Sequence, residues 1–328
     1  MTMRGIRTPA RVGVAGATGA VGIEMVNVLL ERRFPIEELR ALASAREPGR
    51  TVSFGCECVP VVELTRESIE GLDLVLFATK ADVSREFAPL VAASGGIAID
   101  NSRAFRMDAA VPLVVPEVNP GAVDGHGGII ANPNCSTIQT VMALKPLHDA
   151  AVVTRVVACT YQSVSGTGIR AVEELTEQST SVLDGEPVIC EVYPRQISFN
   201  CIPHIDVFDE AGNSREELKM IDETRKILDA PDLPVAVTCV RVPVFRSHAV
   251  AVNVTTERPL SVEEASRLLD EMDPLPAEDR PVTVADAVLS LPALVAELRA
   301  AVCDPDRAAA ERREAARQLA RLARDGVS

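Results

Sequence analysis

The sequence predicts an α/β fold organised as two domains. Short apolar stretches alternate with helical patterns along the first part of the chain, which is typical of a parallel sheet with helices on its faces. The predicted strands are Arg11–Ala15, Leu39–Ser44, Leu74–Thr79 and Ile97–Ser102, and the clearest helix is Val21–Arg33. The length of 328 residues leaves room for a second domain.

A glycine-rich loop joins the first predicted strand to the first helix. Gly16, Gly19 and Gly22 are spaced three residues apart. Backbone N–H groups of such a loop, with those of the helix N-terminus, suit the pyrophosphate of a dinucleotide. We therefore expect a Rossmann-like dinucleotide-binding domain over residues 1–133. The spacing differs from G-x-G-x-x-G, so the motif alone leaves the cofactor open. The expected contacts are Gly16, Thr18, Gly19, Ala20 and Val21.

The end of the strand Leu39–Ser44 favours one nicotinamide cofactor over the other. An NAD-specific fold carries Asp or Glu at this point for the ribose hydroxyls. Here Ser44 is followed by Arg46 and Arg50, whose guanidinium groups suit a 2′-phosphate. The sequence therefore predicts NADP, with Ser44 and Arg46 among its contacts.

The run Asn132–Thr137 places a thiol, Cys135, between an extended apolar segment, 128–131, and a helical pattern, 137–144. Either Asn134 or Ser136 can cap that helix. A thiol at a helix N-terminus lies in the positive end of the helix dipole, which favours the reactive thiolate. The alternative, a buried structural cysteine, is less consistent with the polar residues on both sides.

A second group of chemically versatile residues follows about a hundred residues later. Alternating apolar and polar residues predict a strand over Val235–Val244, and Pro243 indicates a sheet edge or a strand end. Arg241 is suited to bidentate capture of a carboxylate, and His248 to proton transfer near neutral pH. A lone histidine is more often structural, but its combination with Cys135 favours catalysis.

The remaining elements form the second domain, which we place at residues 134–303. Val152–Tyr161 is a predicted strand that leads to Gln162, and Gly168–Leu183 is a predicted helix. Another helix, capped by Asn213 or Ser214, runs to Leu228. Glu216 and Lys219 share one face of it, either as a solvated ion pair or as ligands.

The last part of the chain contains further helical patterns. Ser261 begins a helix with a capping-box partner at Glu264. The segment 304–328 has high helix propensity and is a candidate to complete the dinucleotide-binding domain.

Composition excludes several classes of partner. The net charge of −14 argues against nucleic acid and anionic membranes, and no apolar run has membrane-spanning length. The eight cysteines, with no secretion signal, predict a cytoplasmic protein with reduced thiols. Cys56 and Cys58 lack a second pair at zinc-site spacing, so no metal site is expected.

Six motifs, in order along residues 10 to 260, resemble bacterial aspartate-β-semialdehyde dehydrogenases, whereas the segment 261–328 departs from that family. The motifs are Gly16–Gly22, Asp100–Arg103, Asn132–Thr137, Thr160–Gly166, Glu216–Met220 and Arg241–His248. The resemblance implies an α+β catalytic and dimerisation domain after the dinucleotide-binding domain. It also implies a homodimer, or a dimer of dimers, whose partners are a small-molecule substrate and phosphate.

The implied reaction is the NADPH-dependent reductive dephosphorylation of 4-phospho-L-aspartate to L-aspartate 4-semialdehyde. It serves the biosynthesis of lysine and diaminopimelate, threonine and methionine. Cys135 would form a thioester, His248 would act as acid and base, and Gln162 would orient the intermediate. By the same resemblance, the substrate ligands are Arg103, Asn134, Glu216, Lys219 and Arg241, of which Lys219 and Arg103 bind the phosphate. Ser165 and Gly166 contact the cofactor.

Two other functions remain open at this point. N-acetyl-γ-glutamyl-phosphate reductases use similar cysteine and histidine chemistry on a similar fold, although the Glu216/Lys219 pair favours the aspartate enzyme. The altered C-terminal segment also allows a weakly active or inactive paralogue with a binding role. Retention of Cys135, Gln162 and His248 opposes that alternative.

Overall fold

The computed structural model describes residues 8–44 and 49–272, and the chain divides into two compact units. The first unit comprises Met1–Val156, Leu218–Ala236 and Val254–Ala265. The second comprises Val157–Glu217, Val237–Asn253 and, among the described residues, 266–272. The domain boundary that we place after residue 133 remains a prediction.

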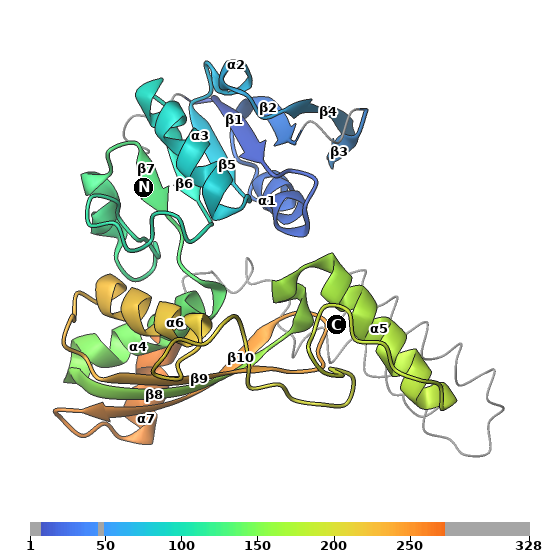
Figure 1. Cartoon of the computed structure of the whole chain (residues 1–328). Coiled ribbons are helices and arrows are strands. Elements are labelled where there is room, and N and C mark those ends of the chain that lie inside the picture. The colour runs from blue at the N-terminus through green and yellow to red at the C-terminus, as the bar shows by residue number, and fades with distance from the viewer. Residues whose placement is uncertain (1–7, 45–48, 273–328) are drawn as a thin grey trace. The chain divides into compact units, whose positions relative to one another are not determined.

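A seven-stranded sheet, in the order β3-β4-β2-β1-β5-β6-β7, forms the centre of the first unit (Figure 1). All its pairs are parallel except β3 with β4. This confirms the predicted α/β fold with a parallel sheet. The strands are β1 (Ala10–Ala15), β2 (Ile36–Ala43), β3 (Thr51–Phe54), β4 (Glu57–Glu63), β5 (Leu74–Phe77), β6 (Ile97–Asp100) and β7 (Ile129–Ala131).

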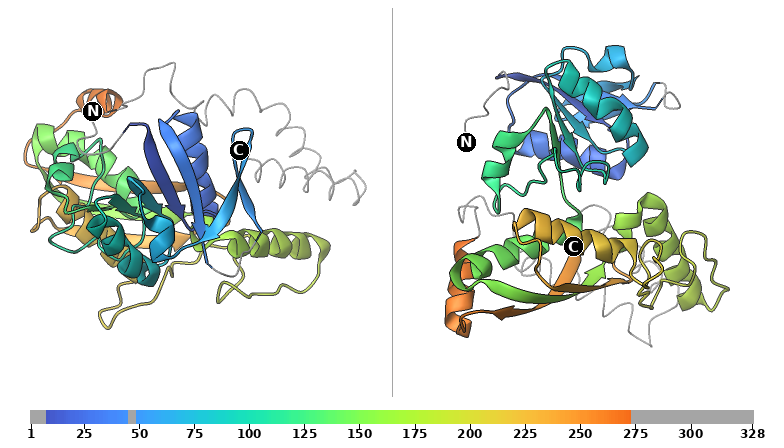
Figure 2. Two further views of the ribbon diagram at one scale, coloured as in Figure 1. Left: turned by 90° about the horizontal axis from the view of Figure 1, so that it is seen from above. Right: turned by 60° about the vertical axis from the view of Figure 1, so that its left-hand side comes forward.

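Alternating residues of β1 belong to two separate cores, because successive side chains of a strand point to opposite faces. Val12 and Val14 pack with Val26 of helix α1 (Ala20–Glu31). Ala15 packs in another cluster with Val91 of helix α3 (Ala81–Ala93). Figure 2 shows these helices alongside the strands in two further views. The short elements α2 (Arg66–Ile69) and η1 (Pro120–Gly125) complete this part of the chain.

The antiparallel β3–β4 hairpin is an element that the sequence analysis did not predict. Gly55, with φ +61°, lies in its turn, and Cys58 pairs with Ser53 across the two strands. Polar residues and Pro60 interrupt the apolar pattern that would announce these strands. The hairpin sits at the edge of the sheet, where a proline that cannot donate to a ladder is tolerated.

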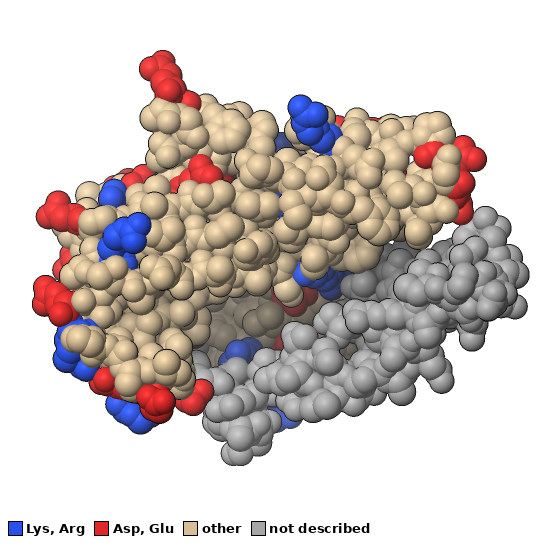
Figure 3. All heavy atoms as spheres, turned by 90° about the horizontal axis from the view of Figure 1, so that it is seen from below, with Lys and Arg blue, Asp and Glu red and all other residues tan. Residues whose placement is uncertain are grey.

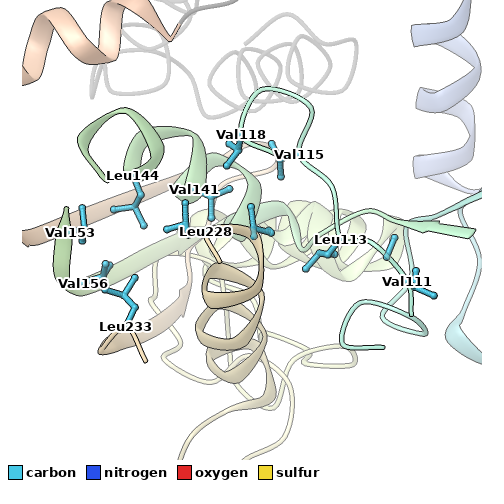
Figure 4. Packing of buried hydrophobic residues seen from close by; sticks show 12 residues of the cluster. Val111, Leu113, Val115, Val118, Val141, Leu144, Val153, Val156, Leu228 and Leu233 are labelled. Carbon is cyan, nitrogen blue, oxygen red and sulfur yellow. The ribbon is translucent and has the colours of Figure 1, made fainter. Parts of the chain in front are cut away.

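A three-stranded sheet, in the order β10-β8-β9, is formed by the later part of the chain. In the first unit, α4 and α6 pack against β8 through one apolar cluster (Figure 4). Val141 and Leu144 come from α4, and Val153 and Val156 from β8. These elements are α4 (Cys135–Ala151), β8 (Val153–Gln162), α6 (Arg215–Ile227), β9 (Val235–Arg241) and β10 (His248–Thr256).

Helix α5 (Ile169–Asp184) organises the second unit. The buried Glu174 accepts hydrogen bonds from the N–H groups of Glu191, Val192 and Tyr193. Tyr193 in turn packs with Val164 of the short helix η2 (Val164–Thr167) in one apolar cluster. The helix therefore fixes the long segment that follows it.

Most predicted elements are confirmed within a few residues. The helix after residue 137 begins earlier, at Cys135, and β9 ends two residues before Pro243, at the sheet edge. Ser214 caps α6, because its Oγ accepts the N–H of Glu217. Ser261 likewise caps α7 (Val262–Glu271) by accepting the N–H of Glu264. The predicted helical segment 304–328 lies outside the described residues.

On the face that Figure 3 shows, charged side chains lie mainly along the margins of the described surface, and its middle carries few of them. Lysine and arginine alternate there with aspartate and glutamate and do not gather into one continuous patch. Among the described residues, no helix is both long and apolar enough to cross a membrane.

Candidate active site

Two neighbouring parallel strands, β6 and β7, end at the same edge of the sheet and supply the first group of site residues. Asp100, the last residue of β6, accepts hydrogen bonds from the N–H and the Oγ of Ser102. Asn132, just after β7, donates from its side chain to Oδ1 of Asn101 at 2.7 Å. The polar turns after the two strands are thus tied together, at the strand ends where open α/β sheets bind ligands.

Cys135 is the first residue of α4 and its side chain is exposed. Asn134 is the capping residue, because its Oδ1 accepts the N–H of Ser136 at 2.9 Å and that of Thr137 at 3.4 Å. This resolves the choice between Asn134 and Ser136. The position combines access to a reactant with the positive end of a helix dipole, which together favour a nucleophilic thiolate.

Glu223 of α6 forms a buried ion pair and also binds the backbone at the start of α4. Glu223 pairs with Arg106 at 2.9 Å and accepts the N–H of Asn134 at 2.6 Å. Burial raises the pKa of Glu223, and the Arg106 guanidinium acts in the opposite direction. The sequence analysis missed these residues. Glu223 could have been found from the helical spacing of Lys219, Glu223 and Lys226, which continues the helix face predicted to carry Glu216 and Lys219.

The two predicted phosphate ligands both belong to the first unit. Arg103 is exposed in the loop after β6. Lys219 is half-buried on α6, one turn beyond Glu216. Their grouping around a phosphate remains a prediction.

In the second unit, a compact group forms around Arg241. Its Nη1 donates to the carbonyl oxygen of Ser163 at 2.5 Å, and its Nε is buried without a hydrogen-bond partner among the described residues. Only 6% of Arg241 is exposed. A buried guanidinium with an unused N–H is suited to an incoming carboxylate.

Gln162 and Glu216 lie in the same unit and bind each other. Nε2 of Gln162 donates to Oε1 of Glu216 at 3.0 Å, and both residues are buried. The amide is therefore held in one orientation. The carboxylate is held close to the end of β8, where the predicted intermediate would be oriented.

Within the part of the chain that the structure describes, the hydrogen bonds of His248 all involve Nδ1. Nδ1 lies 3.0 Å from the Ser163 N and 2.9 Å from the Ser247 carbonyl oxygen, and the tautomer decides which of the two it bonds. With its proton on Nδ1 and donated to the Ser247 carbonyl, the neutral ring can accept a proton at Nε2, and the charged ring can donate one from the same atom. Burial lowers the pKa of His248, and the nearby Arg241 lowers it further. Both protonation states are thus accommodated, as an acid–base catalyst requires.

Gly166 permits the close approach of these side chains. A Cβ at this position would lie 3.2 Å from Nη1 of Arg241 and 3.7 Å from the His248 ring. Ser165, beside it, is hydrogen-bonded to Ser163 at 3.0 Å. Both predicted cofactor residues therefore belong to the Arg241–His248 group of the second unit.

The glycine loop of the first unit fits a dinucleotide. Gly16 has φ +81°, and a Cβ there would lie 2.5 Å from the Ala78 carbonyl oxygen. A Cβ on Gly22 would overlap the Gly16 carbonyl. Gly19, the residue before α1, provides no side-chain hydrogen bond to the N–H groups of the first helical turn. Such a cradle suits a pyrophosphate.

The other predicted cofactor residues surround this loop. Thr18 is partly exposed, and Ala20 and Val21 form the exposed first turn of α1. Ser44 is exposed directly after β2. Arg46 lies outside the described residues.

We expect Cys135 to be alkylated by iodoacetamide faster than the exposed Cys201 at pH 7. The lead should shrink at strongly alkaline pH, where all accessible thiols ionise. Burial raises the pKa of Cys239 to about 12, so this thiol should stay unlabelled. Peptide mapping over a pH series measures all three rates. Equal rates for Cys135 and Cys201 at pH 7 would contradict the proposed activation.

Comparisons with known proteins agree with this geometry. The family model for the semialdehyde dehydrogenase NAD-binding domain matches residues 11–126, and that for the dimerisation domain matches residues 144–308. Aspartate-semialdehyde dehydrogenase of Aquifex aeolicus is 48% identical over 263 residues, which are 79% of this chain and 77% of that protein.

Solved structures give the same result. Aspartate semialdehyde dehydrogenase II of Vibrio cholerae, complexed with ASA, superposes with a TM-score of 0.77 at 44% identity, over 80% of this chain and 79% of that one. The Candida albicans enzyme with NADP superposes with a TM-score of 0.60 at 26% identity, over 80% and 76%. The predicted resemblance is confirmed: the chain belongs to the aspartate-semialdehyde dehydrogenase family.

Proposed function

We propose that this chain catalyses the NADPH-dependent reductive dephosphorylation of 4-phospho-L-aspartate to L-aspartate 4-semialdehyde, in the biosynthesis of lysine and diaminopimelate, threonine and methionine. The observation that carries the proposal is the exposed thiol of Cys135 at the capped N-terminus of α4. Membership of the family supports it. The names of these relatives favour it over both an N-acetyl-γ-glutamyl-phosphate reductase and an inactive paralogue.

The proposed chemistry begins with Cys135. Its thiolate attacks the acyl carbon, the bond to the phosphate oxygen breaks, and phosphate leaves a thioester behind. NADPH, when bound, supplies the hydride that reduces this thioester. His248 protonates the developing alkoxide from Nε2 and takes the proton back as the aldehyde leaves and the thiolate is restored.

The other site residues bind and orient the substrate in this proposal. Arg241, with its unused buried Nε, binds the α-carboxylate. Glu216 binds the amino group, and Gln162, held by Glu216, orients the reacting carbon. The phosphate is assigned to Lys219 and Arg103. Asn134 acts on the reaction through the cap that it provides for Cys135 and through contact with the substrate.

We further propose NADP as the cofactor. The backbone of the loop that contains Gly16 and Gly19 would hold the pyrophosphate, and Ser44 and Arg46 would supply donors for the 2′-phosphate. Arg50, which is exposed just beyond, adds positive charge. Ser165 and Gly166 contact the nicotinamide end.

The match to a dimerisation domain supports a homodimer, and a dimer of dimers remains a proposal. Seven cysteines of the described residues are free thiols. This supports a reducing, cytoplasmic location.

The direct test runs the reaction backwards. With aspartate semialdehyde and NADP, the protein should form NADPH over many turnovers only when phosphate is added, and NAD should be a much poorer oxidant. Cys135→Ala should abolish turnover and keep NADP binding, which calorimetric titration measures. Turnover without phosphate, or an active Cys135→Ala protein, would sink the proposed mechanism.

Replacing Arg241 tests the carboxylate site. Arg241→Lys keeps the charge but loses the planar fork, so the KM for aspartate semialdehyde should rise roughly ten- to a hundredfold. Arg170→Lys is the matched control, because Arg170 forms an exposed ion pair with Glu191. Steady-state kinetics of both variants decide the point. Equal KM values for Arg241→Lys and the wild type would remove Arg241 from the site.

The acid side of the pH profile tests His248. In the aldehyde-oxidising direction its ring must be neutral to accept a proton, so kcat/KM should fall as the pH drops through the pKa of His248. Because burial lowers this pKa from 6.5, the midpoint of the fall should lie below pH 6.5. His248→Asn should lose this limb together with most of the activity. A limb centred above pH 6.5 would contradict the assignment.

A further inference from the structure

One face of α6 carries a repeating pattern of charge beyond the substrate residues. Lys219, Glu223 and Lys226 are separated by four and then three residues, and Glu216 lies three residues before Lys219. These spacings place all four on the same side of a helix. The first two belong to the proposed substrate site, whereas Glu223 and Lys226 point to another role.

Glu223 joins two segments of the first unit that carry proposed catalytic groups. Its Oε2 accepts the N–H of Asn134, the residue that caps α4 and precedes Cys135. Its Oε1 accepts a hydrogen bond from Nη1 of Arg106, whose Nη2 donates to the carbonyl oxygen of Asn101 at 2.8 Å. One carboxylate, only 1% exposed, thus connects the start of α4 to the loop around Arg103.

Lys226 secures the same loop at its other end. Its Nζ donates to the carbonyl oxygens of Arg106 and Asp108 at 2.7 Å, and to that of Val111 at 2.9 Å. An ammonium group has three donors, and all three are used here. The loop is therefore attached to α6 through Glu223 and Lys226, one helical turn apart.

We infer that Glu223 is a positioning residue. It holds the Cys135 thiol and the loop that contains Arg103 in one fixed relative position, here called their register, so that the nucleophile and the leaving phosphate are aligned. The inference rests on the proposed roles of Cys135 and Arg103. Misplacement of reacting groups by about 1 Å can cost on the order of a hundredfold in rate, so such a register matters for the reaction.

The bonding pattern requires a carboxylate at this position. Glutamine has one acceptor oxygen, so its NH₂ group would face either the Arg106 guanidinium or the Asn134 N–H, a donor against a donor. The cap from Oδ1 of Asn134 to Ser136 and Thr137 does not depend on Glu223. Glu223→Gln should therefore release the register and leave Cys135 at the helix N-terminus.

The experiment compares Glu223→Gln with Glu174→Gln. Glu174 is a matched control, because it is a buried carboxylate that also accepts backbone N–H groups, those of residues 191–193. In Glu223→Gln, kcat should fall roughly ten- to a hundredfold and the KM for phosphate should rise. The pH midpoint of Cys135 alkylation should not rise, since a negative charge near the thiol has been removed. Glu174→Gln should lower the melting temperature and leave kcat, the KM for phosphate and the pH midpoint of Cys135 alkylation unchanged.

A double-mutant cycle tests whether Glu223 acts through Arg106. Arg106→Gln alone and the double variant Arg106→Gln/Glu223→Gln should lose similar kcat/KM, because both break the same link. Fully additive losses would overturn the inference. Three other results would also overturn the inference. They are unchanged kinetics in Glu223→Gln, the same kinetic loss in Glu174→Gln, and a rate loss in Glu223→Gln that is matched by a higher pH midpoint of Cys135 alkylation.

Hydrogen exchange separates failure of this inference from failure of the proposed function. It needs no turnover: Glu223→Gln should speed exchange in residues 101–111 and at Asn134 together, and Glu174→Gln should not. Unchanged exchange in both segments would overturn the inference. A wild-type protein without phosphate-dependent NADP reduction would refute the proposed function, and the exchange data would still decide whether Glu223 sets the register.

Discussion

The parallel pairing of β6 with β7 is the constraint on which the first half of the site depends. Parallel neighbours end at the same edge, so the turn that contains Arg103 and the turn that contains Cys135 emerge side by side. The hydrogen bond between Asn132 and Asn101 then ties these two turns. A helix that starts immediately after the second turn gives the thiol its dipole. Sheet topology therefore determines where the proposed nucleophile lies.

Buried polar groups of this protein are arranged so that each holds a segment of the chain in place. Glu223 holds the α4 start and Arg106, while Glu174 holds residues 191–193. In the second unit, the Ser163 N–H lies 3.0 Å from Nδ1 of His248, and the Ser163 carbonyl binds Arg241. Such groups are costly to bury without partners, so the segments that supply the partners become fixed. Arg241 keeps a buried Nε that lacks such a partner among the described residues, which is where a substrate carboxylate would complete the pattern.

Local patterns predicted most of the fold, and non-local pairing accounts for what they missed. The apolar strands, the glycine loop and the helix after Cys135 follow from runs of a few residues. The β3–β4 hairpin did not, because Pro60 and polar residues mask its alternation. The choice of Asn134 as the cap depended on where α4 begins. The pair of Arg106 with Glu223 spans 117 residues, so only the charge spacing along α6 could have indicated it. The roles of the individual site residues are still predictions, since they concern bound species.

The central claim is that Cys135 carries the acyl group as a thioester, and mass spectrometry of the covalent intermediate tests it most directly. The protein is mixed with aspartate semialdehyde and NADP in the absence of phosphate, quenched in acid and digested. The account predicts an aspartyl adduct on the peptide that contains Cys135, which disappears when phosphate is added before the quench. An adduct on another residue, or none while NADPH is formed, would contradict it.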